Sequence, residues 1–309
     1  MMSNLKKTTV IMTTYNGEKY IIEQMESIRN QTLQPDEVLI LDDCSTDSTA
    51  MIVENYINEH KLLHWKFVCN SVNQGWKKNF KNGFDMAESE YIFPCDQDDI
   101  WLDNKIAVMV RCMEEHPEIN VLVSNYELFY SENDAGQNAY ERQYKEMLND
   151  GSVGYIPLNE KWTYITRPGC TFCFRKSFYN AIRENWDTRF PHDAVLWNYA
   201  CMDGSLAILN RKLIRFRRHG NNATSTNNLT RQKRADILKD HLYFYQLALQ
   251  DQQHCSELVL IDGVNFLKNR ILLLEQKKYS VWLVLYLKYS KYYASIKGWL
   301  LDLYLALGK

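Results

Sequence analysis

The chain has 309 residues, of which 46% are hydrophobic and 24% charged, so it can hold one large domain with an appendage or two small domains. Its formal net charge of −2 argues against a dedicated nucleic-acid-binding protein, because such proteins usually carry a basic excess. No apolar run reaches about 18 residues, and residues 1–7 lack the apolar stretch of a secretory signal, so we expect neither a membrane-spanning helix nor a signal peptide.

Strand and helix patterns alternate over the first hundred residues. β-branched and apolar residues at 8–14 predict a buried strand, and apolar residues at helical spacing follow within 18–30. Further strands are expected at 37–41, 66–69 and 91–93, and further helices at 50–57 and 79–87. This alternation predicts an α/β fold with a doubly wound, mostly parallel sheet. Ligands of such sheets bind beyond the carboxyl ends of the strands.

The middle of the chain is less regular. Residues 130–157 are polar and predict an excursion from the sheet. The elements expected after it are strands at 165–174 and 207–216 and a helix at 194–201. Cys170 and Cys173 form a CxxC pair, but a zinc site would need further ligands at suitable spacing, so a buried strand is the favoured interpretation.

Long amphipathic patterns beyond residue 230 predict a C-terminal helical appendage. We therefore place a domain boundary near residue 225. Residues 1–225 would form the domain that carries the sheet and its ligand site, and residues 226–309 the helical region.

Three carboxylates, those of Asp96, Asp98 and Asp99, crowd the end of the strand expected at 91–93. Such crowding is electrostatically costly because like charges raise one another's pKa. A divalent cation relieves this cost, and oxygen ligands suit Mg²⁺ or Mn²⁺, which can hold substrate phosphates at the same time. The competing interpretations are a solvated acidic turn and a helix N-cap, in which Asp99 would cap a helix that starts near Trp101.

A second acidic pair, Asp42-Asp43, ends the strand expected at 37–41. A carboxylate at this position can accept a hydrogen bond from a pyrimidine N–H or from the hydroxyls of a ribose. Capping of the next helix is the alternative, because Ser45 and Asp47 nearby serve the same purpose.

Several motifs occur in a fixed order along the chain. They are Thr13-Thr14-Tyr15-Asn16-Gly17, Gln31-Thr32-Leu33, Val38 to Asp47 with Asp42-Asp43 at its centre, Asn73-Gln74-Gly75, Asn79, and Asp96-Gln97-Asp98-Asp99. This order resembles that of the family 2 glycosyltransferases, which have the glycosyltransferase A-type fold, over residues 8–220. Two later segments, 191–197 and 217–222, look like the rhamnosyltransferase-type branch of that family. Many members carry Glu-Asp where this chain has His192-Asp193.

The resemblance implies a donor site at the strand ends. Thr13, Tyr15 and Asp43 would line the pocket for the nucleobase and ribose. Asp96 and Asp98 would form the metal–diphosphate motif, with Asp98 as the direct ligand of Mn²⁺ or Mg²⁺.

The resemblance also implies a catalytic base and a further metal ligand. Asp193 would take the proton from the acceptor hydroxyl as that hydroxyl attacks the anomeric carbon, through an oxocarbenium-like transition state. His219 would lie near the diphosphate as a metal ligand, and the metal would stabilise the charge on the departing nucleoside diphosphate. The alternatives are a helix N-cap for Asp193 and an ordinary loop histidine for His219.

The implied function is inverting transfer of a sugar from a nucleotide diphosphate to an acceptor hydroxyl on a growing cell-surface polysaccharide, with a lipid-linked acceptor as one form. We favour dTDP-rhamnose as the donor, with a UDP-sugar as the other candidate. A nucleotidyltransferase or pyrophosphorylase is an alternative, but it should carry a glycine-rich basic loop near the first strand, which residues 13–17 do not form. An inactive membrane-bound scaffold of the same fold is a further alternative.

The C-terminal tail predicts peripheral contact with the cytoplasmic face of the cell membrane. After residue 265 it contains eight lysines and arginines against two acidic residues. The basic residues are Lys268, Arg270, Lys277, Lys278, Lys288, Lys291, Lys297 and Lys309, and the acidic residues are Glu275 and Asp302. Lysines interleaved with Tyr and Trp suit a membrane interface with anionic lipids. The alternative is a tail that packs on the protein or on a second copy.

Overall fold

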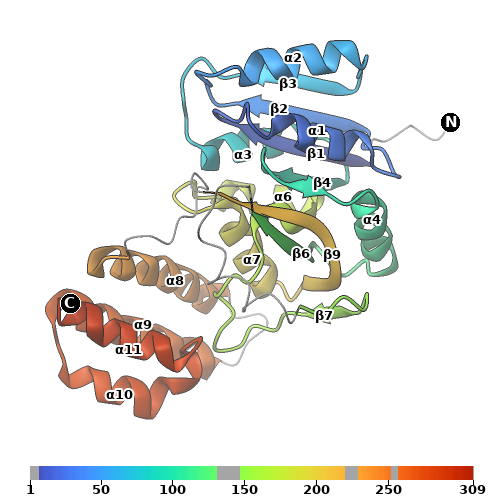
Figure 1. Ribbon diagram of the computed structural model, residues 1–309. Helices are drawn as coiled ribbons and strands as arrows, with labels where there is room; N and C mark the ends of the chain where they lie inside the picture. Colours follow the sequence, from blue (N-terminus) through green and yellow to red (C-terminus); the bar gives the residue numbers. More distant parts are fainter. Residues whose placement is uncertain (1–6, 131–146, 220–228, 252–256, 309) are drawn as a thin grey trace. The chain divides into compact units, whose positions relative to one another are not determined.

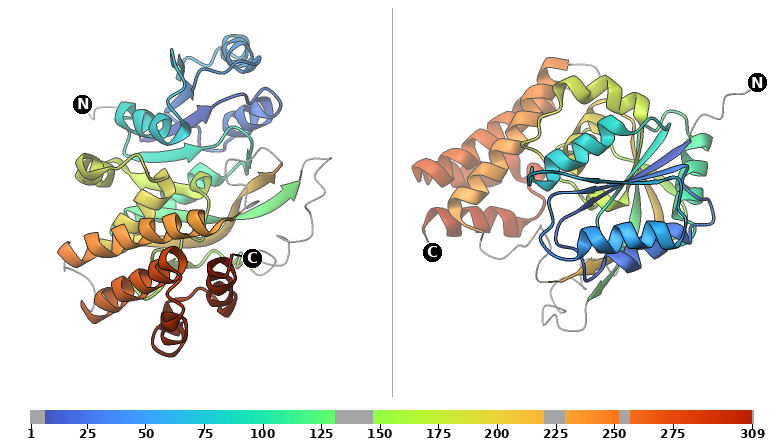
Figure 2. Two further views of the ribbon diagram at one scale, coloured as in Figure 1. Left: turned by 90° about the vertical axis from the view of Figure 1, so that its left-hand side faces the viewer. Right: turned by 90° about the horizontal axis from the view of Figure 1, so that it is seen from above.

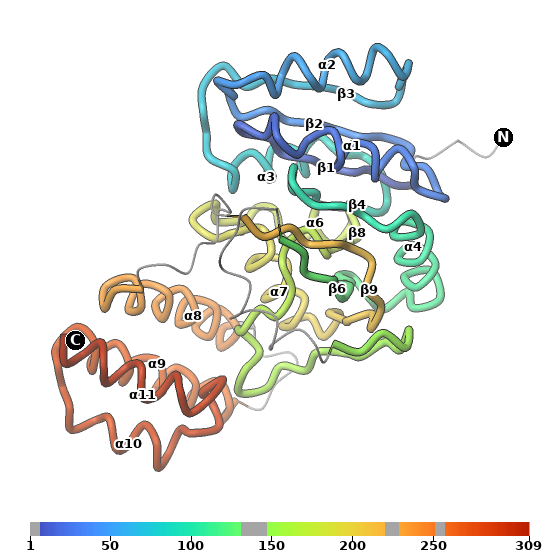
Figure 3. Tube along the Cα trace, in the orientation of Figure 1, coloured from blue at the N-terminus to red at the C-terminus, as the bar shows by residue number. Residues whose placement is uncertain are grey.

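The computed structural model describes residues 7–130, 147–219, 229–251 and 257–308 (Figures 1 and 3). The chain divides into two compact units, which are described separately. The first unit comprises Met1–Tyr155, Arg167–Leu196 and Ser205–Asn222, and the second comprises Ile156–Thr166, Trp197–Gly204 and Ala223–Lys309. The boundary expected near 225 lies outside the described residues. The second unit includes two segments from the middle of the chain in addition to the C-terminal region.

A nine-stranded sheet organises the first unit, in the order β3-β2-β1-β4-β8-β6-β9-β5, with β7 paired to β9. The strands are β1 (Thr8–Thr14), β2 (Glu37–Asp42), β3 (Trp65–Cys69), β4 (Tyr91–Cys95), β5 (Ile100–Trp101), β6 (Val121–Tyr130), β7 (Val153–Tyr155), β8 (Phe172–Arg175) and β9 (Leu206–Arg218). Strands β1, β2, β3, β4, β6 and β9 run in one direction, whereas β5, β7 and β8 run in the opposite direction. The mostly parallel α/β sheet predicted from the sequence is therefore confirmed.

Helices cover both faces of this sheet. They are α1 (Ile21–Arg29), α2 (Thr49–Glu59), α3 (Trp76–Met86), α4 (Lys105–Glu115), α6 (Lys176–Ile182) and the start of α7 (His192–Met202), which continues into the second unit. In the right-hand view of Figure 2, α1 and α2 lie on one side of the strands and α3 on the other. In α1, Ile21, Met25 and Ile28 recur at helical spacing and are fully buried, so this stripe accounts for its packing.

The strand ends bring distant segments to one edge of the sheet. The parallel strands β1, β2, β4 and β9 end there at Thr14, Asp42, Cys95 and Arg218. The short strand β5 then pairs antiparallel to β9, with Ile100 opposite Arg215. Because of this pairing, the acidic loop between β4 and β5 lies next to the end of β9.

Two sequence expectations and one alternative interpretation differ from the structure. Asp99 does not cap a helix, because β5 follows it and α4 begins only at Lys105. The strand expected at 165–174 is a 3₁₀ turn, η1 (Gly169–Thr171), followed by the short strand β8. Within the polar segment 130–157, residues 131–146 lie outside the described residues, while residues 153–155 form β7 and pair with β9.

The second unit contains α8 (Arg231–Asp251), α9 (Glu257–Gln276), α10 (Ser280–Tyr289), the 3₁₀ turn η3 (Ser290–Tyr292) and α11 (Ile296–Ala306). The helical region expected from the sequence is thus present. In the described part of the chain, no helix is both long enough and apolar enough to cross a membrane.

Candidate active site

Hydrogen bonds from the side chain of Gln97 join the acidic loop after β4 to the end of β1. The N–H of Tyr15 donates to Gln97 Oε1 at 2.9 Å, and Gln97 Nε2 donates to the carbonyl oxygen of Tyr15 at 3.0 Å. A Cβ atom on Gly17 would lie 2.2 Å from Gln97 Oε1, so a residue with a side chain would displace Gln97. Glycine at position 17 therefore permits the contact that joins the two loops.

The two residues expected to bind a metal lie in contact. Nε2 of His219 is 2.7 Å from Oδ2 of Asp98, and the two side chains are 14% and 15% exposed. Arg217 orders the acidic loop beside them, because its backbone N–H donates to Asp99 Oδ1 and its Nε donates to the carbonyl oxygen of Asp98. Arg217 is buried and also pairs with Glu23, so it does not face water.

This pair fits a divalent cation. Imidazole nitrogen and carboxylate oxygen are both ligands of Mn²⁺, and two ligand atoms on one ion are typically about 3 Å apart, close to the observed contact. Their partial exposure would leave room for phosphate oxygens of a donor. Asp98 and His219 are therefore the residues that would hold the metal.

A neighbouring cluster fits such an ion less well. Ligand atoms of Asp96, Asp99 and Cys170 lie within 4.8 Å of one another. Burial first, and neighbouring carboxylates second, raise the pKa of Asp96 well above its ordinary value and that of Asp99 to about 7. Burial also raises the pKa of Cys170 well above its ordinary value, so its thiol stays protonated. A protonated, soft sulfur ligand does not suit Mg²⁺ or Mn²⁺.

A buried lysine lies under the same cluster. The amine of Lys105 donates to the carbonyl oxygen of Cys170 at 3.0 Å and lies 3.6 Å from the ring centroid of Trp101. Burial lowers its pKa to about 8, although nearby acidic groups oppose that shift. The acidic loop thus contacts solvent on one side and is supported from the core on the other.

The residues expected around the nucleotide lie at the same edge of the sheet. Thr13 is buried at the end of β1, and Tyr15 beyond it is 47% exposed. Asp43 is buried, and its carboxylate accepts hydrogen bonds from the N–H groups of Gln74 and Gly75 at 2.8 Å and from the Asn70 side chain at 2.9 Å. Asp43 therefore orders the loop that leads into α3, and its contact with a nucleotide remains a prediction.

Asp193 lies in the first turn of α7, where its Oδ1 accepts the N–H of Ala194 at 2.8 Å. Burial raises its pKa to about 6, partly opposed by backbone hydrogen bonds and by Lys77. The charge of Asp193 also contributes to the raised pKa of Asp96, so the two carboxylates are within electrostatic reach. A carboxylate with a pKa near the working pH suits a general base.

The residue before it, His192, is enclosed by aromatic rings. Its ring centroid is 4.0 Å from that of Phe80 and 6.2 Å from that of Trp76, and neither ring nitrogen has a hydrogen-bond partner among the described residues. A Cβ on Gly169 would lie 2.2 Å from His192 Nε2. Burial lowers the pKa of His192 to about 3, so the ring is neutral. An apolar pocket accepts a neutral imidazole more readily than it would accept a charged glutamate.

The family model described as "Glycosyl transferase family 2" matches residues 9–185, more than half of the chain. The chain belongs to this family. The resemblance inferred from the order of its motifs is thereby confirmed.

Two relatives show how far the similarity of this glycosyltransferase extends. An uncharacterized glycosyltransferase of Haemophilus influenzae is 27% identical over 263 residues, which cover 80% of this chain and 76% of the relative. The dTDP-rhamnosyl transferase RfbG of Shigella flexneri is 31% identical over 232 residues, which cover 70% of this chain and 74% of the relative.

Solved structures show the same fold. The Staphylococcus aureus TarS fragment 1–349 in complex with UDP-GlcNAc superposes with a TM-score of 0.64 at 20% identity, covering 98% of this chain and 80% of that chain. The mannosyltransferase PcManGT of Pyrobaculum calidifontis, in complex with GDP-Man and Mn²⁺, gives a TM-score of 0.57 at 16% identity, covering 99% and 81%. The glycosyltransferase A-type fold expected from the resemblance is confirmed.

Two residues that shape the site were not singled out from the sequence. Gln97 joins the β1 and β4 loops, and Lys105 lies beneath the acidic loop. Arg217, which the sequence suggested could touch phosphates or face water, instead holds the backbone of that loop. Gly17 was the available signal for Gln97, because a glycine at a strand end often marks a close approach by another group.

Proposed function

We propose that this family 2 glycosyltransferase is metal-dependent and inverting, and that it transfers a sugar from a nucleotide diphosphate to an acceptor hydroxyl. The contact of Asp98 with His219 at 2.7 Å is the observation that carries the proposal. Two segments 121 residues apart supply a carboxylate and an imidazole to one point at the ligand-binding edge of the sheet. A structural turn would not require either group.

On the donor side, Mn²⁺ or Mg²⁺ bound at Asp98 and His219 would neutralise charge on the departing diphosphate. Arg217 and Gln97 hold the backbone on which Asp98 is placed, so the ligand position is set before the donor arrives. Thr13, Tyr15, Asp43 and Asp96 contribute to the nucleotide-sugar site in this proposal.

On the acceptor side, Asp193 is the base. Its Oδ2 accepts the hydroxyl proton while Oδ1 stays bonded to the N–H of Ala194. The raised pKa lets this carboxylate hold the proton after transfer more readily than an ordinary aspartate would. Proton removal increases the nucleophilicity of the acceptor oxygen as it attacks the anomeric carbon opposite the leaving group.

We favour dTDP-rhamnose as the donor. The similarity to a dTDP-rhamnosyl transferase over most of both chains supports this choice. The structural neighbour with bound UDP-GlcNAc makes a UDP-sugar the competing donor. The proposed acceptor is a growing cell-surface polysaccharide, carried on a lipid at the inner face of the cell membrane, where the enzyme would bind peripherally.

A screen of nucleotide sugars by thermal shift, with Mn²⁺ and with chelator, tests the proposal. A true donor stabilises the folded chain by mass action, and we expect the largest shift with dTDP-rhamnose in Mn²⁺. The donor that shifts the melting temperature is then incubated with saccharide acceptors. Release of nucleoside diphosphate together with a glycosylated product supports the proposal, whereas a metal-independent shift for every nucleotide sugar contradicts it.

A further inference from the structure

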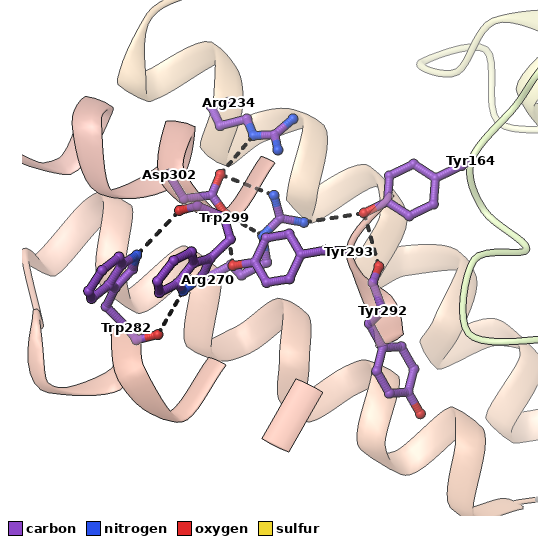
Figure 4. Close-up of polar contacts among 8 residues, drawn as sticks. All are labelled: Tyr164, Arg234, Arg270, Trp282, Tyr292, Tyr293, Trp299 and Asp302. Atoms are coloured by element: carbon purple, nitrogen blue, oxygen red, sulfur yellow. Dashed lines mark hydrogen bonds and ion pairs between the residues drawn. The ribbon is translucent and has the colours of Figure 1, made fainter. Parts of the chain in front are cut away.

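Helices α10 and α11 use their inner faces to build the second unit. Asp302 of α11 is fully buried and accepts hydrogen bonds from Arg270 Nε at 2.6 Å, from Arg234 Nε at 3.0 Å and from the Tyr293 hydroxyl at 3.1 Å (Figure 4). This arrangement fixes which side of α11 faces inward.

A tryptophan pair joins the two helices side by side. The rings of Trp282 in α10 and Trp299 in α11 stack with centroids 4.0 Å apart and planes 6° apart. Each indole N–H donates to the backbone carbonyl of the other residue, at 3.3 and 3.0 Å (Figure 4). Tyr286, on the outer side of α10, also contacts Trp299, with ring centroids 4.7 Å apart. The outer surfaces of the two helices therefore adjoin.

These outer surfaces are apolar, the reverse of an ordinary surface helix. We call them the α10–α11 face. It consists of Leu283 (55% exposed), Val284 (46%) and Leu287 (73%) on α10 and Leu300 (49%), Tyr304 (53%) and Leu307 (52%) on α11. Their spacing along each helix places them on one side, opposite buried residues such as Leu285 and Leu305. An exposed apolar patch of this kind marks a surface that binds something.

The charges around the face have one sign. Residues 277–308 contain five lysines, all exposed, and one acidic residue, Asp302, which is buried. The lysines are Lys277, Lys278, Lys288, Lys291 and Lys297. Lys288 and Lys291 lie near Asp262 and Glu160, whereas Lys277, Lys278 and Lys297 have no carboxylate within 4.0 Å among the described residues. The rim of the face is therefore positive.

We infer that the α10–α11 face is the surface by which the enzyme docks on an anionic lipid bilayer. The inference names the surface that would make the membrane contact included in the proposed function. It rests on the proposed function only for the reason why the enzyme would bind a membrane. Leucine and tyrosine side chains enter the interface between headgroups and acyl chains, and the lysines contact the anionic headgroups. A second copy docking symmetrically on the same face would bring the positive rim against itself. The positive rim is therefore complementary to an anionic bilayer and not to a second copy of the same face.

Sedimentation of the full-length chain with vesicles of equal parts phosphatidylglycerol and phosphatidylcholine tests this surface. Leu287→Glu and Leu258→Glu form a matched pair, because both leucines are 73% exposed in the second unit and Leu258 lies outside the face, on α9. We expect Leu287→Glu to lower the bound fraction at least tenfold and Leu258→Glu to leave it near that of the unchanged chain. Equal losses in both variants would overturn the assignment.

The lysines give a second readout. One lysine near an anionic surface is worth about a fivefold change in partition, so Lys297→Gln should weaken binding by roughly that factor. Raising salt from about 0.1 M to about 1 M shortens the Debye length from about 10 Å to about 3 Å and should weaken binding without abolishing it. Binding to vesicles of phosphatidylcholine alone, unchanged by salt, would contradict a role for the rim.

Two controls separate this inference from sugar transfer and from self-association. Asp98→Ala should bind vesicles like the unchanged chain, because the lipid surface does not involve the donor site. If the unchanged chain binds vesicles but transfers no sugar, the docking surface is supported and sugar transfer is contradicted. If it transfers sugar but binds no vesicles, sugar transfer is supported and the docking surface is contradicted. Light scattering without lipid should show the same mass for the unchanged chain and Leu287→Glu. A dimer that Leu287→Glu dissociates would assign the face to a second copy and overturn the lipid assignment.

Discussion

Replacement of Asp193 by asparagine should remove activity and stabilise the fold at the same time. Asparagine keeps the size of the side chain, and its carbonyl oxygen can still accept the N–H of Ala194. It cannot accept the acceptor proton, so turnover should fall by about 10²–10⁴-fold, the usual contribution of a positioned general base. Donor affinity should stay near normal, because in this proposal the donor diphosphate is held through Asp98 and His219 while Asp193 acts on the acceptor.

The stabilisation follows from the raised pKa. Burial moves the pKa of Asp193 from 3.8 to about 6, so the folded chain binds this proton more tightly than the unfolded chain does. Below pH 3.8 the carboxyl group is protonated in both states and does not lower the free energy of unfolding. As the pH rises from 3.8 through about 6, the buried group loses its proton less readily than in the unfolded chain, and the free energy of unfolding falls. Above that range the cost reaches about 3 kcal/mol, an upper bound because the side chain keeps some contact with water.

Urea denaturation of both chains at several pH values, without metal or donor, measures this difference. We expect Asp193→Asn to be more stable by about 1–3 kcal/mol at about pH 8, with the difference shrinking toward zero as the pH falls to about 4. The kcat/KM of the unchanged enzyme should rise with pH through about 6. A variant that is less stable at every pH would show that the carboxylate is not strained, and near-normal turnover would make it structural.

Four other outcomes are expected. Asp98→Ala should abolish turnover and weaken nucleoside-diphosphate binding in Mn²⁺ but not in chelator, as measured by calorimetry, and unchanged affinity in Mn²⁺ would remove the metal role. In a competition assay, dTDP-rhamnose should support transfer better than UDP-sugars, and the opposite order would overturn the donor assignment. Gly169→Ala should lower stability by about 1–3 kcal/mol through overpacking against His192, and a His192→Ala background should remove most of that loss. Asp302→Asn should destabilise the second unit by about 3–5 kcal/mol, since Arg270 would lose its buried carboxylate, and a loss below about 1 kcal/mol would contradict that role.

The alternation of strands and helices could be predicted because each element carries its own periodic pattern. The buried run of β1 and the stripe of Ile21, Met25 and Ile28 in α1 are local signals. The parallel order of the strands then placed the acidic loop and Asp43 at one edge without any knowledge of long-range contacts.

The contacts within the site depend on pairings that leave no local pattern. The two-residue strand β5 brings Asp98 to His219, and no window of sequence distinguishes it from the start of a helix. Arg217 lies between the half-buried residues Phe216 and Arg218 in β9. It is itself buried because its guanidinium pairs with Glu23 and donates to the carbonyl oxygen of Asp98.

The C-terminal tail shows the same limit. Its composition predicted aromatic residues at a membrane interface, but Tyr289, Tyr292 and Tyr293 are buried in the second unit. The exposed apolar residues of the tail are four leucines, Val284 and Ile296, together with three other tyrosines, Tyr279, Tyr286 and Tyr304. Composition cannot separate these two sets, because the division depends on the buried carboxylate of Asp302 and the tryptophan stack.

The most direct test of sugar transfer with inversion is the anomeric configuration of the product, determined by NMR during turnover in Mn²⁺. We predict release of nucleoside diphosphate and a glycosidic bond of the configuration opposite to that of the donor, with no product from Asp98→Ala and only a trace from Asp193→Asn. A product that retains the donor configuration, or release of pyrophosphate in place of nucleoside diphosphate, would contradict the proposed chemistry.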